Sequence, residues 1–146
     1  MKITDEIEIS APAEVVWHIQ TDADRLAEWL PGFQSSARSD GGGPFVAGSR
    51  ARIKQTGLPA TEWTAQEVDD DLHRFVWSTK VLGMSLVATH VVTPSTTDGR
   101  VVNRLEVDAS GGLTSVLAPV LKGRLAKQLA AENAALKARA EEQADG

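Results

Sequence analysis

The sequence contains no cysteine among its 146 residues. Without cysteine the chain forms no disulfide bond, has no thiolate nucleophile and offers no cysteine ligand to a metal ion. Three histidines are present, and their positions do not follow the spacing of a metal site. We therefore expect neither a metal nor another cofactor, and we expect a reducing, cytoplasmic location.

The sequence also lacks an excess of positive charge and a long apolar run. Its formal net charge is -5, with lysine and arginine scattered, so no basic surface for nucleic acid is expected. The longest apolar run, near Val116 to Leu121, is too short to cross a membrane. The first residues, Met1 to Glu6, turn acidic at once, which is not typical of a signal peptide. We expect no nucleic-acid partner and no stable membrane insertion.

The longest periodic segment runs from Leu113 to Glu142, after a Gly111-Gly112 hinge. Its leucines fall within an arc of roughly 120° at helical spacing, which predicts one long amphipathic helix that covers a core. We interpret residues 1–146 as a single domain, because this length and a hydrophobic content of 42% support one core. Residues 141–146 lie beyond the last leucine and are expected to fray.

The remainder of the chain favours a strand, two short helices and then six strands. Alternating apolar residues from Ile3 to Ile9 predict the first strand, and Pro12 begins a helix through Gln20. A second short helix follows at Ala23 to Leu30. The glycine-rich segment Ser39 to Pro44 is expected to be a flexible loop. The later strands are predicted at Phe33 to Arg38, Phe45 to Gln55, Ala60 to Val68, Arg74 to Lys80, Ser85 to Thr93 and Arg100 to Asp108. Short connections indicate antiparallel pairing and an α+β fold.

The chain resembles a known superfamily at several positions. The segment Ile9 to Trp17, followed by Asp22 and by Trp29-Leu30-Pro31-Gly32, is similar to the opening of the START-like (SRPBCC) superfamily, in particular its polyketide cyclase/dehydrase-like branch. One departure is Gly99-Arg100, where the branch usually has Gly-Thr. Further landmarks follow in the same order, namely Gly48 with Arg50 and Arg52, Trp63, Arg74 to Trp77, Val92 to Pro94 and Leu136-Lys137.

This resemblance covers nearly the whole chain, and it implies a helix-grip fold. In that fold a curved seven-stranded antiparallel sheet wraps around the long C-terminal helix, with two short helices after the first strand. The resemblance also implies an internal cavity for hydrophobic small molecules. A curved sheet closed by one helix leaves such a gap on physical grounds as well.

Strand parity predicts which side chains face this cavity. Each of three strands is oriented by its more apolar face, and two leucines of the long helix face the same space. A single bulge in the strand from Ser85 to Thr93 would instead turn His90 outwards and place Val87, Thr89 and Val91 inside. Trp63 and Val68 have opposite parity, so either a bulge or a solvent-facing Trp63 is required. We favour Trp63 at the rim. The predicted ligand-binding residues are Phe75, Trp77, Leu86, Ala88, His90, Asn103, Leu105, Leu121 and Leu125.

His90 is the sharpest candidate for chemistry. An imidazole among apolar neighbours can act as a general acid or base, or can bind a ligand carbonyl. A hydrogen-bonded wall residue is the simpler interpretation, because no carboxylate partner is visible in the sequence. Arg124, Gln128 and Glu132 recur every four residues on the long helix, and we favour local pairing at a groove edge over contact with the cavity. No catalytic residue is assigned.

The main hypothesis is that the protein binds a hydrophobic small molecule, such as a lipid, a polyketide or an aromatic compound, as a monomer or homodimer. Two alternatives remain open. In the first, an aromatase/cyclase-like or dehydratase-like enzyme uses the same cavity, with His90 assisting proton transfer. In the second, the domain is a protein-interaction module. The fold alone does not choose among them.

Overall fold

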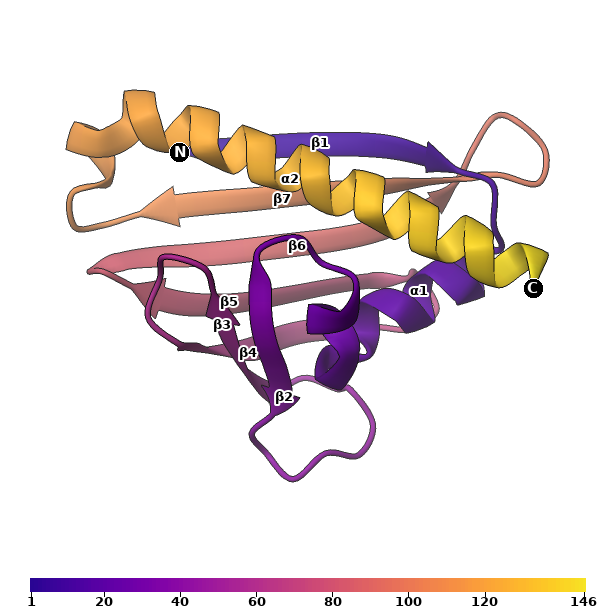
Figure 1. Ribbon diagram of the computed structural model, residues 1–146, viewed down its shortest axis with the longest axis horizontal. Coiled ribbons are helices and arrows are strands. Elements are labelled where there is room, and N and C mark those ends of the chain that lie inside the picture. The colour runs from indigo at the N-terminus through magenta and orange to yellow at the C-terminus, as the bar shows by residue number, and fades with distance from the viewer.

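The computed structural model describes residues 1–146 and consists of seven strands, two α-helices and one 3₁₀ helix (Figure 1). The first strand and the short helices are β1 (Lys2–Ile9), α1 (Ala13–Thr21) and η1 (Ala23–Glu28). The remaining elements are β2 (Phe33–Arg38), β3 (Arg50–Gln55), β4 (Thr61–Asp69), β5 (Arg74–Val81), β6 (Met84–Pro94), β7 (Val101–Ser110) and α2 (Thr114–Asp145).

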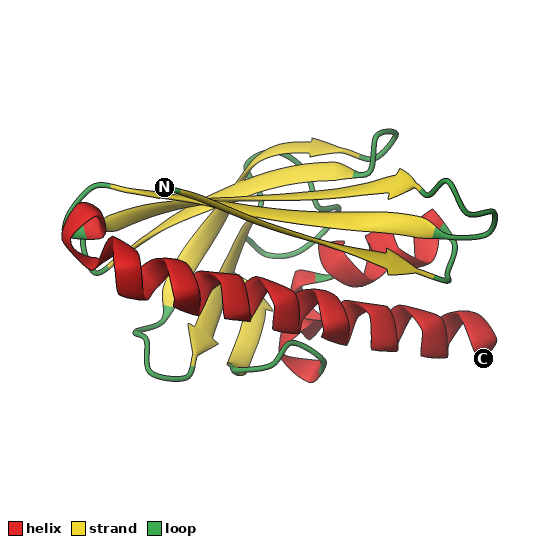
Figure 2. Ribbon diagram, turned by 90° about the horizontal axis from the view of Figure 1, so that it is seen from above, coloured by secondary structure: helices red, strands yellow, loops and turns green.

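All seven strands form one antiparallel sheet in the order β1-β7-β6-β5-β4-β3-β2. Each strand from β2 to β6 pairs with the next strand along the chain. β1 closes the other edge against β7. The sheet is curved, and α2 runs along one of its faces (Figure 2). This architecture confirms the predicted α+β helix-grip fold.

The turn into α2 depends on glycine. Gly111 and Gly112 have φ angles of 76° and 54°, a region that favours glycine. A β-carbon on Gly112 would lie 2.6 Å from the carbonyl oxygen of Gly83, in the β5–β6 turn. The start of α2 therefore sits directly against that turn, and a side chain at position 112 would displace it.

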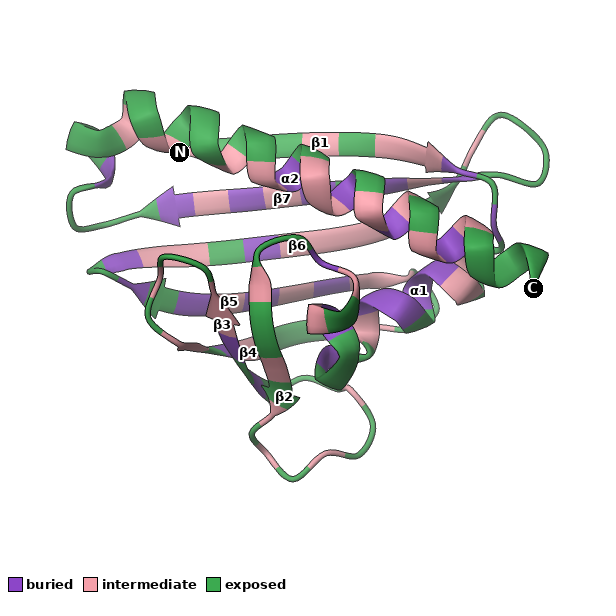
Figure 3. Ribbon diagram, viewed as in Figure 1, coloured by how far each residue is buried: buried purple, intermediate pink, exposed green.

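α2 packs unevenly along its length. It lies along β1 and β7 and meets α1 near its C-terminal end. In the second half of the helix Leu129, Asn133, Leu136 and Ala140 are buried, whereas Thr114 is the one buried residue before them (Figure 3). The predicted leucine stripe is therefore a core contact in its C-terminal half alone.

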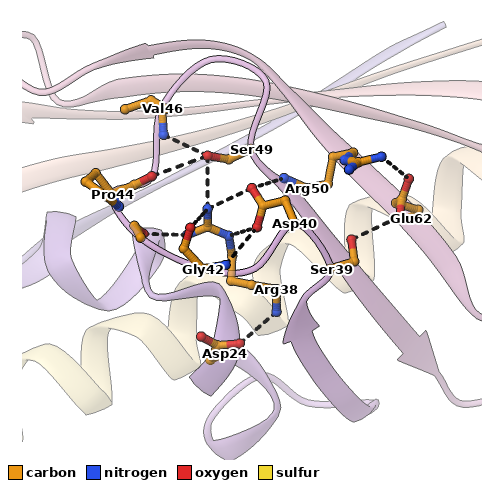
Figure 4. Close-up of polar contacts among 11 residues, drawn as sticks. Asp24, Arg38, Ser39, Asp40, Gly42, Pro44, Val46, Ser49, Arg50 and Glu62 are labelled. Atoms are coloured by element: carbon orange, nitrogen blue, oxygen red, sulfur yellow. Dashed lines mark hydrogen bonds and ion pairs between the residues drawn. The ribbon is translucent and has the colours of Figure 1, made fainter.

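The loop between β2 and β3 is held by a partly buried ion pair. The Arg38 guanidinium donates two hydrogen bonds of 2.9 Å to the carboxylate of Asp40 and a third to Ser49 (Figure 4). These bonds hold the pKa of the Asp40 carboxyl well below its usual range. The predicted strand from Phe45 is too long, because β3 begins at Arg50. The backbone N–H of Arg50 donates to the Asp40 carboxylate, so the loop ends at this cluster.

A β-bulge in β4 decides the orientation of Trp63. The register with β5 shifts between Ala65 and Glu67, which places one extra residue in β4. The bulge turns both Trp63 and Val68 inwards, so Trp63 is 8% exposed. The prediction that Trp63 lies at the rim is wrong, and the bulge that was the other interpretation is present.

The C-terminal helix continues to Asp145. The Glu141 carboxylate accepts a hydrogen bond of 2.8 Å from the backbone N–H of Ser10 and pairs with Lys137. Fraying of residues 141–146 stays a prediction, as does the single-domain assignment. None of the helices combines the length and the apolarity needed to span a bilayer.

Candidate functional site

A cavity of about 150 Å³ lies between the inner face of the sheet, η1 and the middle of α2. Hydrophobic residues make up 16 of its 26 lining residues, so apolar contacts dominate the wall. An apolar cavity of about 150 Å³ is large enough to hold a benzene-sized molecule. The cavity forms because the curved sheet and α2 touch along β1 and β7 but diverge over the central strands.

Six of the predicted ligand-binding residues lie on this wall, namely Trp77, Leu86, Ala88, His90, Leu105 and Leu125. The other three do not. Phe75 is 1% exposed and lies behind His90, Asn103 is fully buried in a hydrogen-bond network, and Leu121 is half-buried elsewhere on α2. Strand parity thus identified the correct face of β5, β6 and β7, but it did not show how far each side chain lies from the cavity.

Aromatic rings form one connected cluster, in which Trp63 and Trp77 line the cavity while Phe75 and Phe45 lie behind them. The rings of Trp63 and Trp77 lie 5.2 Å apart, and Trp77 meets Phe75 edge-on at 5.7 Å. Phe45 packs edge-on against both Phe75 and Trp77, so the loop that Arg38 anchors also contacts the aromatic rings. Such offset and edge-to-face contacts fix the rings and leave π faces available to a flat apolar molecule.

His90 is the main polar group on the sheet side of the cavity. Its ring stacks on Phe75 with 4.2 Å between centroids and 7° between planes. Its Nδ1 lies 3.1 Å from Oε1 of Gln20. Burial lowers the pKa of His90 from 6.5 to about 3, so the imidazole is neutral near pH 7.

Glu132 is the main polar group on the helix side. Burial raises the pKa of its carboxyl from 4.5 to about 7, and a hydrogen bond from Gln128 acts in the opposite direction. Both residues line the cavity, whereas Arg124 is exposed. Gln128 and Glu132 do pair with each other, but the preference for pairing over contact with the cavity is wrong for both, because both line it.

Trp63 brings an unusual feature to the wall. Its indole Nε1 is buried and has no hydrogen-bond partner. A buried N–H without an acceptor is costly, and such groups are rare in folded proteins. Trp63 also lines the cavity. The indole N–H of Trp63 is therefore an unpaired donor sealed inside the wall.

Several wall residues escaped the sequence analysis. They come from the short helices, the strands β2 to β4, the β3–β4 turn and α2, where neither parity nor helical spacing showed which side faces the cavity. Gln20 gave no signal because its partners lie far away in the sequence. The missed residues include Gln20, Leu26, Trp29, Leu30, Phe33, Ile53, Leu58, Pro59, Trp63, Gln128, Glu132 and Leu136.

The arrangement has two chemical capacities. Its apolar and aromatic surface can take a flat hydrophobic molecule out of water, while the few polar groups orient that molecule. The Glu132 carboxyl, with a pKa of about 7, can either donate or accept a proton near neutral pH.

Residues 1–141 match the family described as polyketide cyclase / dehydrase and lipid transport. No curated protein matches the chain. Because the family match spans most of the chain, it includes every element that surrounds the cavity.

Solved structures with the same fold include proteins of different kinds. The Zhui aromatase/cyclase from Streptomyces sp. R1128 superposes with a TM-score of 0.81 at 14% identity, covering 98% of this chain and 94% of that chain. A START superfamily protein from Mycobacterium smegmatis gives 0.76 at 17% identity, with 97% and 98% covered. Norcoclaurine synthase from Thalictrum flavum gives 0.70 at 17% identity, with 94% and 91% covered. At these identities the likeness shows a shared fold.

Proposed function

We propose, since the chain belongs to the polyketide cyclase/dehydrase and lipid transport family, that it binds a hydrophobic small molecule in the cavity between its sheet and α2. The ligand class is an aromatic compound, a polyketide or a lipid. The observation that carries this proposal is the apolar cavity with the paired indole rings of Trp63 and Trp77 on its wall. A cytoplasmic location and a monomeric or homodimeric state remain predictions from the sequence.

The binding energy of such a ligand would come mainly from apolar contact. Removing apolar surface from water contributes about 25 cal/mol per Å². The central strands supply flat rings on one side, and Leu125, Leu129 and Leu136 of α2 supply aliphatic surface on the other. A flat molecule placed between these walls is covered on both faces.

The mouth of the cavity lies between α2 and two turns. The lining residues there are partly exposed, namely Phe33 after η1, Leu58 and Pro59 of the β3–β4 turn, and Leu125 and Gln128 of α2. Gln128 Nε2 donates a long hydrogen bond of 3.4 Å to the carbonyl of Pro31, which links the two sides. A ligand larger than one ring would separate these sides, because the cavity itself is of single-ring size.

A pair of β6 variants tests the binding proposal. Ala88 lies on the cavity wall and is 6% exposed, whereas its neighbour Val87 is 38% exposed on the opposite face of the sheet. Ala88→Phe adds a ring inside the cavity, and Val87→Phe adds similar bulk outside it. We expect hydrophobic probes to bind the parent protein and Val87→Phe but not Ala88→Phe, by calorimetry on samples with folded circular dichroism spectra. Equal binding by both variants would place the ligand elsewhere.

An enzyme is the second candidate, and Glu132 is the observation that favours it. A general acid–base works best when its pKa is near the working pH, which holds for Glu132 and not for His90. The ionised carboxylate could take a proton from carbon beside a ligand carbonyl, and the protonated form could return one to a departing hydroxyl, which leaves as water. An aromatase/cyclase shares the fold.

Turnover assays with Glu132→Gln separate the two candidates. An enzyme that uses this carboxyl should lose roughly 100-fold or more in kcat, with little change in ligand affinity. A carrier has no turnover to lose. A solid, collapsed core would have favoured the interaction-module hypothesis, and the cavity removes that support.

A further inference from the structure

A chain of side-chain hydrogen bonds connects the surface strand β1 to His90 in the cavity. Asn133 of α2 donates to the Asp5 carboxylate at 2.8 Å, and Asn103 of β7 donates to Asn133 at 2.7 Å. Gln20 of α1 donates to Asn103 at 2.8 Å, and His90 Nδ1 lies 3.1 Å from the Gln20 carbonyl oxygen. Five elements, β1, α2, β7, α1 and β6, are joined by these bonds.

The carboxylate at one end sets the direction of every bond. An ionised carboxylate accepts hydrogen bonds and donates none, so Asn133 must present its NH₂ group to Asp5. Its carbonyl oxygen then faces Asn103, which must in turn present NH₂. The same step repeats at Gln20, whose carbonyl oxygen is left facing His90. A carbonyl accepts only, so His90 must donate from Nδ1.

The side-chain amides of Gln20, Asn103 and Asn133 are buried. Asn103 and Asn133 are 0% exposed and Gln20 is 5% exposed, so no bulk water competes for their hydrogen bonds. Each bond is strengthened in these surroundings, and an amide turned the wrong way would leave two buried groups unpaired. The chain is therefore held in one orientation rather than in two equivalent ones.

We propose that this chain holds His90 as the Nδ1–H tautomer and presents its bare Nε2 to the cavity, so that the ligand carries a hydroxyl group that donates to Nε2. The inference rests on the proposed function, and it narrows the ligand class to hydrophobic alcohols, phenols or enols. In this role Gln20 is a positioning residue for His90.

Three observations support an acceptor that is free for a ligand. Nε2 has no hydrogen-bond partner in the protein, yet it is not among the sealed polar atoms, so its open side faces the cavity that His90 lines. Stacking on Phe75 fixes the plane of the ring. Burial keeps the imidazole neutral, so Nε2 retains its lone pair near pH 7.

The chemistry of Nε2 selects against other ligand groups. A ketone, ether or ester oxygen would bring a second lone pair against Nε2, with no hydrogen between them. An ammonium group could donate, but it would lose its water among apolar walls. A hydroxyl supplies the donor without a charge.

Phenol and toluene provide matched probes, because they differ by one hydroxyl in place of a methyl group. We would titrate both into the parent protein and into His90→Phe, which keeps an aromatic ring and removes both nitrogens. A lost hydrogen bond should weaken phenol by about 2- to 12-fold, while toluene changes by less than about twofold. Equal losses for the two probes would overturn the hydroxyl assignment and leave the proposed function standing. If neither probe binds the parent protein, both proposals fail.

The tautomer is measured independently by ¹⁵N NMR of the histidine ring. The parent protein should show His90 protonated at Nδ1, and Gln20→Met should populate the Nε2–H form because the acceptor is gone. Asp5→Asn provides a milder variant at a half-buried site, since an amide there no longer dictates the direction of the chain. Asp98→Asn makes the same charge change in an exposed turn and should leave the tautomer unaltered. An Nε2–H ring in the parent protein would overturn the proposal.

Discussion

At the residue scale, two buried tryptophans differ in how their indole N–H groups are satisfied. Trp17 is 3% exposed and donates from Nε1 to Asp70 at 3.0 Å, whereas Trp63 is 8% exposed and has no acceptor. Their packing losses on truncation should be similar, because both sit in the same hydrophobic cluster. A difference between them therefore reports the hydrogen bond.

Trp17→Phe should accordingly destabilise the protein by about 1 to 3 kcal/mol more than Trp63→Phe. Trp17→Phe removes the hydrogen bond to Asp70, whereas Trp63→Phe removes an N–H donor that has no partner. Urea unfolding monitored by circular dichroism measures both free energies. If the two variants are equally stable, the Trp63 N–H must be bonded in solution.

Glu132 makes the stability of the protein depend on pH in a defined window. Its folded pKa of about 7 lies above the ordinary value of 4.5, so the folded state binds more protons between these values. This contribution is therefore fully present below about pH 4.5 and is lost as the pH rises through about 7.

Glu132→Gln should remove that dependence, which we expect to be about 1 to 3 kcal/mol between pH 4.5 and pH 7. The control is Glu142→Gln, because Glu142 is exposed on the same helix. Chemical unfolding at several pH values gives the comparison. A stability curve for Glu132→Gln parallel to that of Glu142→Gln would show that folding leaves the pKa of Glu132 at its ordinary value.

At the element scale, the two halves of α2 differ in what they contribute to folding. Leu129 is 4% exposed and belongs to the core cluster, while Leu117 is 43% exposed. Leu125 lies between these extremes, half-buried on the cavity wall. The helix therefore acts as a core element towards its C-terminus and as a cavity wall near its middle.

Leu129→Ala should cost about 2 to 5 kcal/mol of unfolding free energy, as for other buried leucines. Leu117→Ala should cost less than about 0.5 kcal/mol, because its surface stays in water. Leu125→Ala should fall between the two. Thermal and urea unfolding of the three variants decides the order, and a large loss at Leu117 would mean that the first half of α2 is covered in solution.

The sequence was sufficient for the elements and insufficient for their mutual orientation. Alternation fixed the inner faces of β5, β6 and β7, so Trp77, Ala88 and Leu105 were placed correctly. Trp63 was misplaced because one extra residue in β4 reverses parity, and the bulge has no compositional signal. Gln20 and Asn133 were missed because their hydrogen-bond partners are distant in sequence.

At the scale of the whole molecule, the sheet and α2 form two walls that are joined along one side. α2 is attached through β1, β7 and α1, while the cavity separates it from the central strands. The strands β5 to β7 carry continuous backbone pairing. The first half of α2 carries three apolar side chains with much of their surface in water, Val116, Leu117 and Val120, and Leu113 just before the helix is exposed as well.

Amide hydrogen exchange should therefore reveal a gradient of local stability. Amides in α2 from Leu117 to Arg124 should exchange fastest among the regular elements, because few buried contacts oppose their local unfolding. Amides of β6 and β7 should be slowest, since they open only with the whole domain.

Saturation with phenol should slow exchange around Leu125 to Leu136, where the helix lines the cavity, by more than it slows exchange at Leu117 to Arg124. Mass spectrometry of peptic fragments measures these segments separately. Uniform exchange along α2, with or without the probe, would mean that the helix opens as a single unit and that the cavity is not bounded by a locally mobile wall.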